Sequence, residues 1–384
     1  MESVPGAVAT GLHLVILILL KSYPVAIAPG THLMTLQHKS MKKLAPLALR
    51  LCFLLQLLSI AAIAQEQQFA ALGDFKLRSG EVIRDCRIGY RTFGKLNQQQ
   101  SNAIIFPTWA GGTTEQLTSN IGPGRLVDSD QYFVVAIDAL GNGVSSSPSN
   151  SKLQPRMSFP KFTLRDTVET QHELITKVLH LNRVKAVVGV SMGGMQTFQW
   201  MVAYPDFMEK AVPVVGSPRL ATYDLLLWQA QIDAITNDRD WNNGNYSTNP
   251  ARRLEYEFGE LLLTTPDHYN QKVTREQLLA NLKKSESDPA LDANDKIRQA
   301  QAMMALDVSQ DFGGSMERAA AAVRAKTFVI VSRFDHVVTP APAREFARLL
   351  HSQTLELDSD CGHLAPSCDS QRVNQAVAVF LAGN

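Results

Sequence analysis

Short runs of apolar residues recur along the chain after residue 65, and many are apolar throughout rather than alternating. Strands that are buried on both faces of a sheet have this pattern. Helix-like stretches lie between the runs, at residues 164–179 and 195–203. Strands alternating with helices are typical of a mostly parallel α/β sheet flanked by helices, and we expect eight strands. The predicted strands are residues 74–77, 86–92, 103–106, 133–137, 186–190, 212–215, 327–331 and 354–357.

The pattern changes between residues 221 and 318, where strand signals disappear and apolar positions recur at helical spacing. The clearest helical stretches are residues 225–234, 253–263 and 297–306. We predict that residues 221–318 form a helical lid inserted between two parts of one core, residues 65–220 and 319–384. An independent second domain is the alternative. It is disfavoured because the strand pattern resumes at Thr327 without a linker rich in Pro, Gly or Ser.

Residues 41–64 have the organisation of a signal peptide: a Met-Lys-Lys start, an apolar stretch, and the small-residue pattern Ala-Ile-Ala at the end. We predict cleavage after Ala64 and a periplasmic or secreted protein. Pro46, Arg50 and Gln56 interrupt the apolar stretch. This disfavours a permanent membrane anchor, because spanning a bilayer takes about 20 mostly apolar residues.

An upstream extension, residues 1–40, precedes the predicted signal peptide and contains its own short apolar run at residues 12–20. A second hydrophobic segment ahead of a complete signal peptide is unusual. We therefore expect Met41 to be the true initiator, and an intact mass of a mature protein beginning at Met1 would contradict this.

Composition narrows the range of partners. The 384 residues are 45% hydrophobic and 19% charged, which is ordinary for a globular protein. Lys and Arg number 37 against 36 Asp and Glu, a net charge of +1, so no field of one sign would gather polyanions. Nucleic acid is therefore not expected as a partner.

Three cysteines follow Ala64, and an odd number in an oxidising compartment is most simply one disulfide and one free thiol. Cys361 and Cys368 bracket His363 and are placed to staple its loop, while the alternative is two reduced thiols beside it. The third cysteine is Cys86. Since no Cys or His pairs occur at zinc-ligand spacing in the sequence, we predict no metal site.

The predicted strand that ends at Val190 runs into Gly-Val-Ser-Met-Gly-Gly, with Ser191 at its centre, and then into a helical stretch. Strand, tight turn and helix in this order are the context of a nucleophile elbow. A turn this sharp strains the backbone at the nucleophile, and glycines are needed where bulky side chains would collide with the strand and helix. The sequence therefore predicts that Ser191 is a catalytic nucleophile rather than part of a mere glycine-rich turn.

A serine nucleophile requires a histidine base and an acid that holds that histidine in the correct tautomer. Asp335 follows the predicted strand 327–331, and His363 follows the next one, so both lie where catalytic loops begin. The order Ser, Asp, His along the chain is that of α/β hydrolases. We predict a triad of Ser191, Asp335 and His363, with His336 as the rival base and Asp138 as the rival acid.

The oxyanion formed when a serine attacks an acyl group needs backbone N–H donors. Met192, next to the nucleophile, is expected to supply one. The other is expected from the loop after the third predicted strand, where Trp109 is our prediction and Thr108 and Ala110 are the alternatives.

From about residue 75 to residue 363 the chain resembles the homoserine O-acetyltransferase family, a branch of the α/β-hydrolase fold that transfers acetyl from acetyl-CoA through a serine. The matching stretches are residues 90–97 (YRTFGKLN), 121–133 (IGPGRLVDSDQYF), 188–196 (VGVSMGGMQ), 241–246 (WNNGNY) and 305–308 (ALDV). The resemblance implies an α/β-hydrolase fold with the helical segment as its lid, and it permits a homodimer. It places Ser191, Asp335 and His363 on the family's triad. It places Trp109 and Met192 on the family's oxyanion donors.

The chain departs from the family where the substrate binds. The family usually has Asp directly after the catalytic His, where it helps hold the amino group of homoserine, and this chain has Leu364. The loop after the third strand, usually His-Ala-Leu-Thr-Gly, is Pro-Thr-Trp-Ala-Gly at residues 107–111. An exported protein would also meet little acetyl-CoA, which is a cytoplasmic thioester.

We therefore expect an exported hydrolase that cleaves a small ester or related acyl compound through an acyl-enzyme, without cofactor or metal. The first alternative is an O-acetyltransferase that moves acetyl from acetyl-CoA to homoserine or another alcohol. A second is a non-catalytic binding protein that keeps the fold.

Overall fold

The structure is a computed structural model, and it describes residues 66–383 apart from residue 251 and residues 287–290. The predicted signal peptide and the extension before it lie outside the described residues. Among the described residues, no helix has both the length and the hydrophobicity that crossing a bilayer would take.

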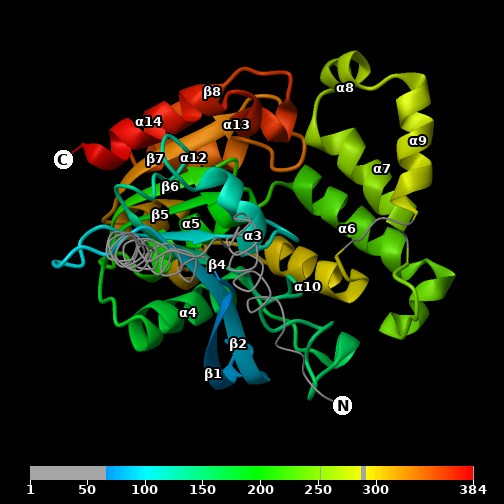
Figure 1. The fold of residues 1–384 in the computed structure, drawn as a ribbon, viewed down its shortest axis with the longest axis horizontal. Helices are drawn as coiled ribbons and strands as arrows, with labels where there is room; N and C mark the ends of the chain where they lie inside the picture. The colour runs from blue at the N-terminus through cyan, green and yellow to red at the C-terminus, as the bar shows by residue number, and fades with distance from the viewer. Residues whose placement is uncertain (1–65, 251, 287–290, 384) are drawn as a thin grey trace, which may run out of the picture. The chain divides into compact units, whose positions relative to one another are not determined.

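Eight strands form one sheet in the order β1-β2-β4-β3-β5-β6-β7-β8 (Figure 1). β1 pairs antiparallel with β2, and β2 with β4, while every other pair of neighbours is parallel. The strands are β1 (Gln68–Lys76), β2 (Val82–Phe93), β3 (Ala103–Pro107), β4 (Phe133–Ile137), β5 (Val184–Val190), β6 (Met208–Val214), β7 (Lys326–Ser332) and β8 (Gln353–Leu357). The prediction of a mostly parallel, eight-stranded sheet is confirmed.

The predicted strand ends are least accurate at the antiparallel edge of the sheet and at the start of β6, which begins at Met208 rather than at residue 212. The prediction for β4 matches its bounds, whereas β1 begins at Gln68 rather than at residue 74. β4 is buried along almost its whole length, but in β1 only Ala70 and Phe75 are buried. An edge strand with a solvated face carries polar residues, which dilute the apolar signal.

Helices cover both faces of the sheet. The helices are α3 (Thr114–Leu117), α4 (Leu164–Glu173), α5 (Met192–Ala203), α6 (Thr222–Thr236), α7 (Arg252–Leu263), α8 (Pro266–Lys272), α9 (Arg275–Ser285), α10 (Ala293–Met304), α11 (Met316–Ala322), α12 (Ala341–Leu349), α13 (Ala365–Cys368) and α14 (Ser370–Ala382). The shorter turns are 3-10 helices η1 (Thr118–Asn120), η2 (Arg156–Ser158), η4 (Arg239–Gly244), η5 (Gln310–Phe312) and η6 (Gly362–Leu364), together with the π-helical turn η3 (Leu174–Val178).

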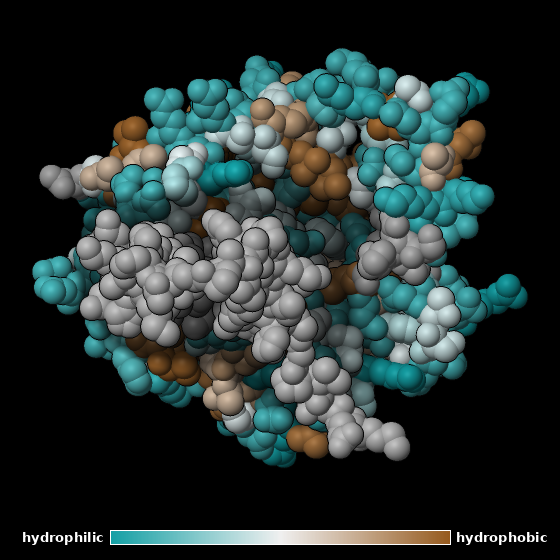
Figure 2. Space-filling model, viewed as in Figure 1, coloured by the Kyte–Doolittle hydropathy of each residue, from teal (hydrophilic) through white to brown (hydrophobic). Residues whose placement is uncertain are grey.

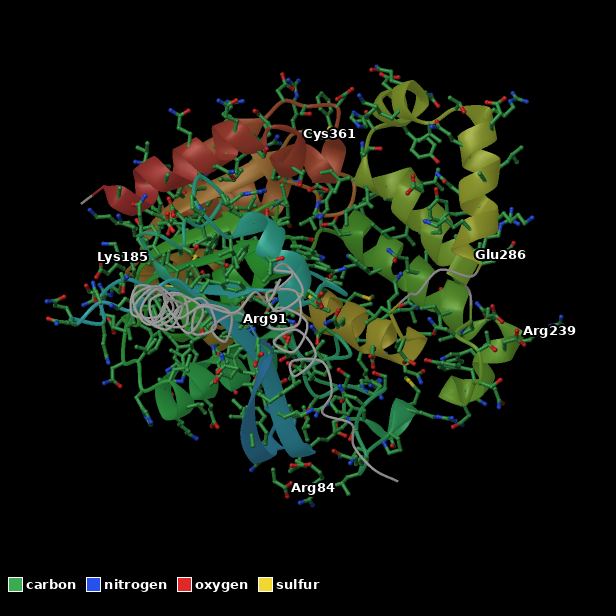
Figure 3. The ribbon with its side chains drawn as sticks, viewed as in Figure 1. Arg84, Arg91, Lys185, Arg239, Glu286 and Cys361 are labelled. Carbon is green, nitrogen blue, oxygen red and sulfur yellow. A yellow bond between two sulfur atoms is a disulfide. The ribbon has the colours of Figure 1, made fainter. Side chains whose placement is uncertain are left out.

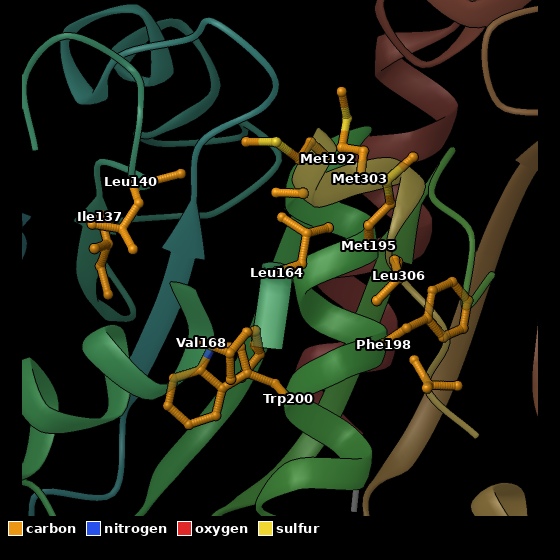
Figure 4. Close-up of a cluster of buried hydrophobic side chains, with 14 of the residues drawn as sticks. Ile137, Leu140, Leu164, Val168, Met192, Met195, Phe198, Trp200, Met303 and Leu306 are labelled. Atoms are coloured by element: carbon orange, nitrogen blue, oxygen red, sulfur yellow. The ribbon is translucent and has the colours of Figure 1, made fainter. Parts of the chain in front are cut away.

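Successive residues of the central strands point to opposite faces and so build two cores. Ile105 of β3 belongs to a core that also contains residues of α4, α5, α11 and α12. Its neighbours Ile104 and Phe106 belong to a second core with residues of α3 and α14. Figure 4 shows part of the first core, where Trp200 and Phe198 of α5 are fully buried. Helix α5, which begins beside Ser191, is thereby held firmly against the sheet.

The segment from residue 221 to residue 318 is helical, as predicted, and holds α6 to α10 and the start of α11, which runs past the predicted boundary to Ala322. In Figure 1, α6 to α9 lie to one side of the sheet, and α10 is joined to the loop after β4 by the hydrogen bond from the Gln299 amide to Leu140 O. Met303 of α10 and Leu306 join the core cluster around α5 (Figure 4). Since Trp228, Ile232 and Ile235 of α6 belong to the same cluster, the segment is attached to the core through both α6 and α10.

Candidate active site

The turn between β5 and α5 holds Ser191 in a strained conformation. Its φ is 58° and its ψ is −121°, a region that costs a non-glycine residue about 1–3 kcal/mol. Ser191 N–H donates to Val214 O at 2.9 Å, which fixes the turn to the neighbouring strand β6. A Cβ on Gly189 would lie 2.1 Å from Gly193 O, and one on Gly193 would lie 2.6 Å from Pro107 O. The glycines of the motif are required because backbone atoms occupy the space that a side chain would need.

The structure brings Ser191, His363 and Asp335 into one hydrogen-bonded chain. His363 Nε2 lies 2.9 Å from Ser191 Oγ, and His363 Nδ1 lies 2.6 Å from Asp335 Oδ2. An ionised carboxylate can only accept hydrogen bonds, so the proton between Asp335 and His363 belongs to Nδ1. Nε2 is then free to accept the proton of Ser191.

Asp335 is held by its own loop, which follows β7. Its Oδ1 accepts the N–H groups of Val337 at 2.8 Å and Val338 at 2.9 Å, so both oxygens are engaged. Asp335 is 3% exposed and His363 is 7% exposed. The rival base, His336, is exposed, and its neighbour Asp335 points away to His363.

Asp138, the rival acid, lies in a different network. It is fully buried, and it accepts the Thr114 N–H and the Asn142 amide through Oδ1, at 2.8 and 2.9 Å. Its Oδ2 accepts Thr114 Oγ1 at 2.9 Å and the Gln67 amide at 3.0 Å. These contacts tie the loop after β4 to α3 and to the start of β1. The carboxylate is engaged in shaping loops rather than in orienting His363.

The loop after β3 and the start of α5 supply the candidate oxyanion donors. Met192 is the first residue of α5, so its N–H has no acceptor within the helix. Thr108 N–H donates to Ile137 O at 3.1 Å and Gly111 N–H to Gln299 Oε1 at 2.8 Å, so neither is available to an oxyanion. The N–H groups of Trp109 and Ala110 have no acceptor among the described residues. Thr108 is thus removed from the alternatives, while Trp109 and Ala110 both remain.

A cavity of about 670 Å³ opens onto Ser191 and His363. Its other lining residues are Trp109, Ala110, Ser119, Asn120, Arg125, Leu126, Val190, Trp228, Leu263, Val337, Leu364, Pro366, Ser367, Ser370, Val373 and Asn374. Trp228 of α6 and Leu263 of α7 come from the helical segment, which therefore forms part of the wall. Figure 2 shows hydrophobic side chains gathered on the surface where α6 and α7 approach α13. Leu364 lies in this cavity and is 39% exposed.

The loop that carries His363 is closed by a disulfide between Cys361 and Cys368. Cys361, labelled in Figure 3, also faces α8, where its Sγ lies 3.5 Å from His268 Nδ1. The same loop is tied to the helical segment by Thr265, whose N–H and Oγ1 both donate to Asp360 O. The structure thus selects the staple over two reduced thiols.

Cys86 is free and buried, and burial raises the pKa of its thiol to about 12, so it stays protonated and unreactive. One set of possible metal-ligand types stands out among the described residues: His268, Cys361 and Cys368, with ligand atoms within 4.8 Å of one another. Because the two sulfurs are bonded to each other, they offer no thiolate to a metal.

Two residues that position the site were missed by the sequence interpretation. Gln299 of α10 accepts the Gly111 N–H and donates to Leu140 O at 2.9 Å, which joins the loop after β3 to the loop after β4. Asp224 of α6 accepts the N–H and the hydroxyl of Thr339, close behind Asp335. Neither residue follows a motif, and each partner is more than 100 positions away in sequence, so only the folded chain brings them together.

The family model for the alpha/beta hydrolase fold matches residues 104–367. A probable esterase of Corynebacterium glutamicum, Cgl0839, is 30% identical over 79% of this chain and 91% of its own length. An ethyl acetate hydrolase of Pseudomonas veronii is also 30% identical, over the same shares of the two chains. A homoserine O-acetyltransferase of Methanococcoides burtonii is 28% identical over 80% of this chain and 72% of its own.

Solved structures of an esterase and of a homoserine O-acetyltransferase also superpose on this chain. The acetyl esterase MekB superposes with a TM-score of 0.78 at 27% identity, covering 83% of this chain and 98% of that one. A homoserine O-acetyltransferase of Bacillus anthracis superposes with a TM-score of 0.72 at 25% identity, over the same shares. Esterases and homoserine acyltransferases thus share this architecture.

Proposed function

This chain belongs to the alpha/beta hydrolase fold family and is an enzyme, a hydrolase or an O-acyltransferase, and within that range we propose that it is an exported serine esterase. Its substrates are small esters or related acyl compounds, and the acyl group passes through Ser191. The observation that carries the proposal is the hydrogen-bonded chain from Ser191 through His363 to Asp335, of which Ser191 and His363 line a cavity.

Acylation uses each member of this chain. Ser191 Oγ attacks the ester carbonyl carbon while its proton moves to His363 Nε2. Asp335 holds the imidazole in the tautomer that accepts this proton and stabilises the imidazolium that forms. The oxyanion takes hydrogen bonds from Met192 N–H and from the N–H of Trp109, with Ala110 as the neighbouring alternative. The C–O bond then breaks, and the leaving alcohol takes the proton from His363.

Deacylation repeats these steps with water. A water molecule gives a proton to His363 Nε2 as its oxygen attacks the acyl-enzyme, and Ser191 Oγ leaves and recovers the proton. The products are a carboxylic acid and free enzyme. In both acylation and deacylation, side chains and backbone groups of the chain transfer every proton and stabilise every charge. The proposed mechanism therefore needs neither metal nor cofactor.

Leu364 supports hydrolysis rather than transfer to homoserine. It lies beside His363 in the cavity wall, and a leucine cannot form the ion pair with an amino group that an aspartate forms at this position. The names of two relatives at 30% identity, an esterase and an ethyl acetate hydrolase, support the same direction. Short-chain esters are therefore the substrate class that we propose.

Export rests on residues 41–64, which lie outside the described residues. The disulfide supports it, since disulfides persist mainly in oxidising compartments. Cell fractionation and the intact mass of the mature protein test this, with Gln65 as the expected first residue. A mature protein that retains Met41 and stays in the cytoplasm would contradict it.

We also propose a homodimer, which the family resemblance permits. Light scattering tests this by measuring whether the molar mass in solution is that of one chain or two.

Hydrolysis of short acyl esters by the mature protein tests the main proposal. We expect turnover in water alone, and we expect Ser191→Ala to lower kcat/KM by about 10⁴-fold or more because the nucleophile is lost. Thermal unfolding of the variant is the control for an intact fold. Ester turnover that survives Ser191→Ala would refute the mechanism.

The second candidate is an O-acyltransferase that uses acetyl-CoA as co-substrate. It is favoured by the similarity to homoserine O-acetyltransferases over 80% of this chain. Incubation with acetyl-CoA and homoserine separates the two, because rapid formation of O-acetylhomoserine would establish transfer and overturn the esterase proposal.

A further inference from the structure

A second cavity, of about 260 Å³, lies next to the catalytic one. The two have four lining residues in common: Ala110, Trp228, Leu263 and Val337. These four residues therefore form the boundary between the cavities. Neither Ser191 nor His363 lines the second cavity, so it takes no part in the chemical step itself.

The second cavity is built mainly by the helical segment and is mostly apolar. Its apolar lining includes Leu227 of α6, Phe258 and Leu262 of α7, and Ala300 and Met303 of α10. Its polar lining consists of Gln231, Lys296 and Gln299. The Gln299 amide is already committed to Gly111 and Leu140, so it offers little to a ligand. Such a lining favours a hydrocarbon group.

Gly259 faces this cavity from the middle of α7. A glycine inside a helix costs about 0.5–1 kcal/mol relative to alanine, so its presence calls for a local reason. Packing does not supply one, because a Cβ at this position would meet only Leu263 Cδ1, at 3.9 Å. The effect of the glycine is to leave the cavity open where a larger side chain would enter it.

The direction of the reaction decides which half of the ester can reach the second cavity. The leaving oxygen takes its proton from His363, so the alcohol half lies on the imidazole side, among Leu364, Pro366 and Ser367. None of these residues lines the second cavity. The acyl half then extends away from the imidazole, and Ala110, which lies beside the candidate oxyanion donor Trp109, belongs to the boundary with the second cavity.

We infer that the second cavity is an acyl-chain pocket and that Gly259 keeps it open. This inference rests on the proposed esterase function and deepens it by naming the substrate class, which is esters of aliphatic carboxylic acids with about four to eight carbons. The upper limit follows from the volume, because a cavity of about 260 Å³ holds about eight groups of the size of water, at about 30 Å³ each. Acetyl esters leave this pocket empty.

Two isomeric esters test the assignment, because methyl hexanoate and pentyl acetate carry the same atoms with the hydrocarbon on opposite sides of the ester. Each buried methylene is worth up to about fourfold in affinity, so we expect kcat/KM for methyl hexanoate to exceed that for methyl acetate by at least about tenfold. Gly259→Leu fills the pocket and should lower this ratio by at least about tenfold, because the acyl chain is then excluded. Pentyl acetate should respond much less to the same variant.

Leu261→Ala is the matched control on the same helix, since Leu261 is 73% exposed and lines neither cavity. It should leave the ratio of methyl hexanoate to methyl acetate turnover as in the parent protein. A Gly259→Leu enzyme with the parent ratio would overturn the inference. A variant that affects pentyl acetate more than methyl hexanoate would overturn the assignment to the acyl half.

Binding without turnover separates this inference from the esterase proposal. Ser191→Ala protein is titrated with methyl hexanoate and methyl acetate, followed by tryptophan fluorescence because Trp228 lines both cavities. We expect methyl hexanoate to bind at least about tenfold more tightly, and the added Gly259→Leu change to remove the difference. If the parent protein hydrolyses no ester but this binding pattern holds, the esterase proposal fails and the acyl pocket stands. Equal binding of the two esters would refute the pocket.

Discussion

Two glycines show how differently the nucleophile turn and the helical segment are built. A Cβ on Gly189, before Ser191, would lie 2.1 Å from a backbone oxygen of α5. A Cβ on Gly259, in α7, would meet only the end of a leucine side chain at 3.9 Å. One glycine is required by close packing of the backbone, and the other leaves space. The backbone around Ser191 therefore has no room for a further side chain, whereas α7 has room for one beside the second cavity.

The strongest test of this comparison is Gly189→Ala. Its Cβ would collide with Gly193 O, and neither β5 nor α5 can move because both are packed in the core. We expect the free energy of unfolding to fall by about 3 kcal/mol, measured by urea denaturation. A value within about 0.5 kcal/mol of the parent protein would show that the turn is looser than the structure indicates.

Asp295→Asn tests the attachment of the helical segment to the sheet. Asp295 of α10 accepts the N–H of Ser149 at 2.9 Å and its hydroxyl at 2.5 Å, and burial raises the pKa of its carboxyl to about 7. An unfolded aspartate has a pKa of about 4, so the folded protein holds this proton more tightly. Its contribution to stability is full below about pH 4 and is lost as the pH rises through about 7.

Asparagine cannot ionise, so the variant should keep above pH 7 the stability that the parent protein loses. At pH 8 we expect a difference of about 2–4 kcal/mol in the free energy of unfolding, since three pKa units correspond to about 4 kcal/mol. Thermal unfolding measured from pH 4 to pH 8 checks this. Asp267→Asn, at an exposed position on α8, is the control and should follow the parent profile. Parallel profiles for Asp295→Asn and the parent protein would contradict the assignment.

Removal of the disulfide tests the catalytic side of the comparison. The double variant Cys361→Ser, Cys368→Ser should lose about 2 kcal/mol of unfolding free energy, because the closed loop is short. Since His363 lies inside this loop, kcat should fall more than KM rises. A variant with parental kcat would show that the hydrogen bonds of His363 and Asp360 hold the loop without the staple.

The smallest expected effect is a gain. Gly259→Ala should raise the free energy of unfolding by about 0.5–1 kcal/mol, because alanine favours the helix and its Cβ has room. Urea denaturation of both variants in one experiment should show a lower free energy of unfolding for Gly189→Ala and a higher one for Gly259→Ala. Destabilisation by Gly259→Ala would mean that α7 packs more closely at this point than the structure shows.

Local signals were enough to predict the strands and the positions of Ser191, Asp335 and His363. Ser191 and Asp335 follow β5 and β7, which are buried, mostly apolar runs, whereas His363 lies one loop beyond β8, which is short and mostly exposed. The elbow is also local, since its glycines and serine are neighbours in sequence. Local sequence could not decide which of Trp109, Ala110 and Thr108 supplies the second oxyanion donor. That depends on which N–H groups already have acceptors elsewhere in the fold, as Thr108 N–H has in Ile137 O.

The sequence by itself determined the eight strands of a mostly parallel sheet, the order of the candidate triad along the chain and the helical nature of residues 221–318, because apolar periodicity and turn glycines act over a few residues. Only the tertiary structure decided that Gln299 holds the loop after β3, that Cys361 pairs with Cys368, and that a second cavity lies beside the first. These features depend on segments far apart in the chain meeting at distances of a few ångströms, and no short stretch of sequence carries that information.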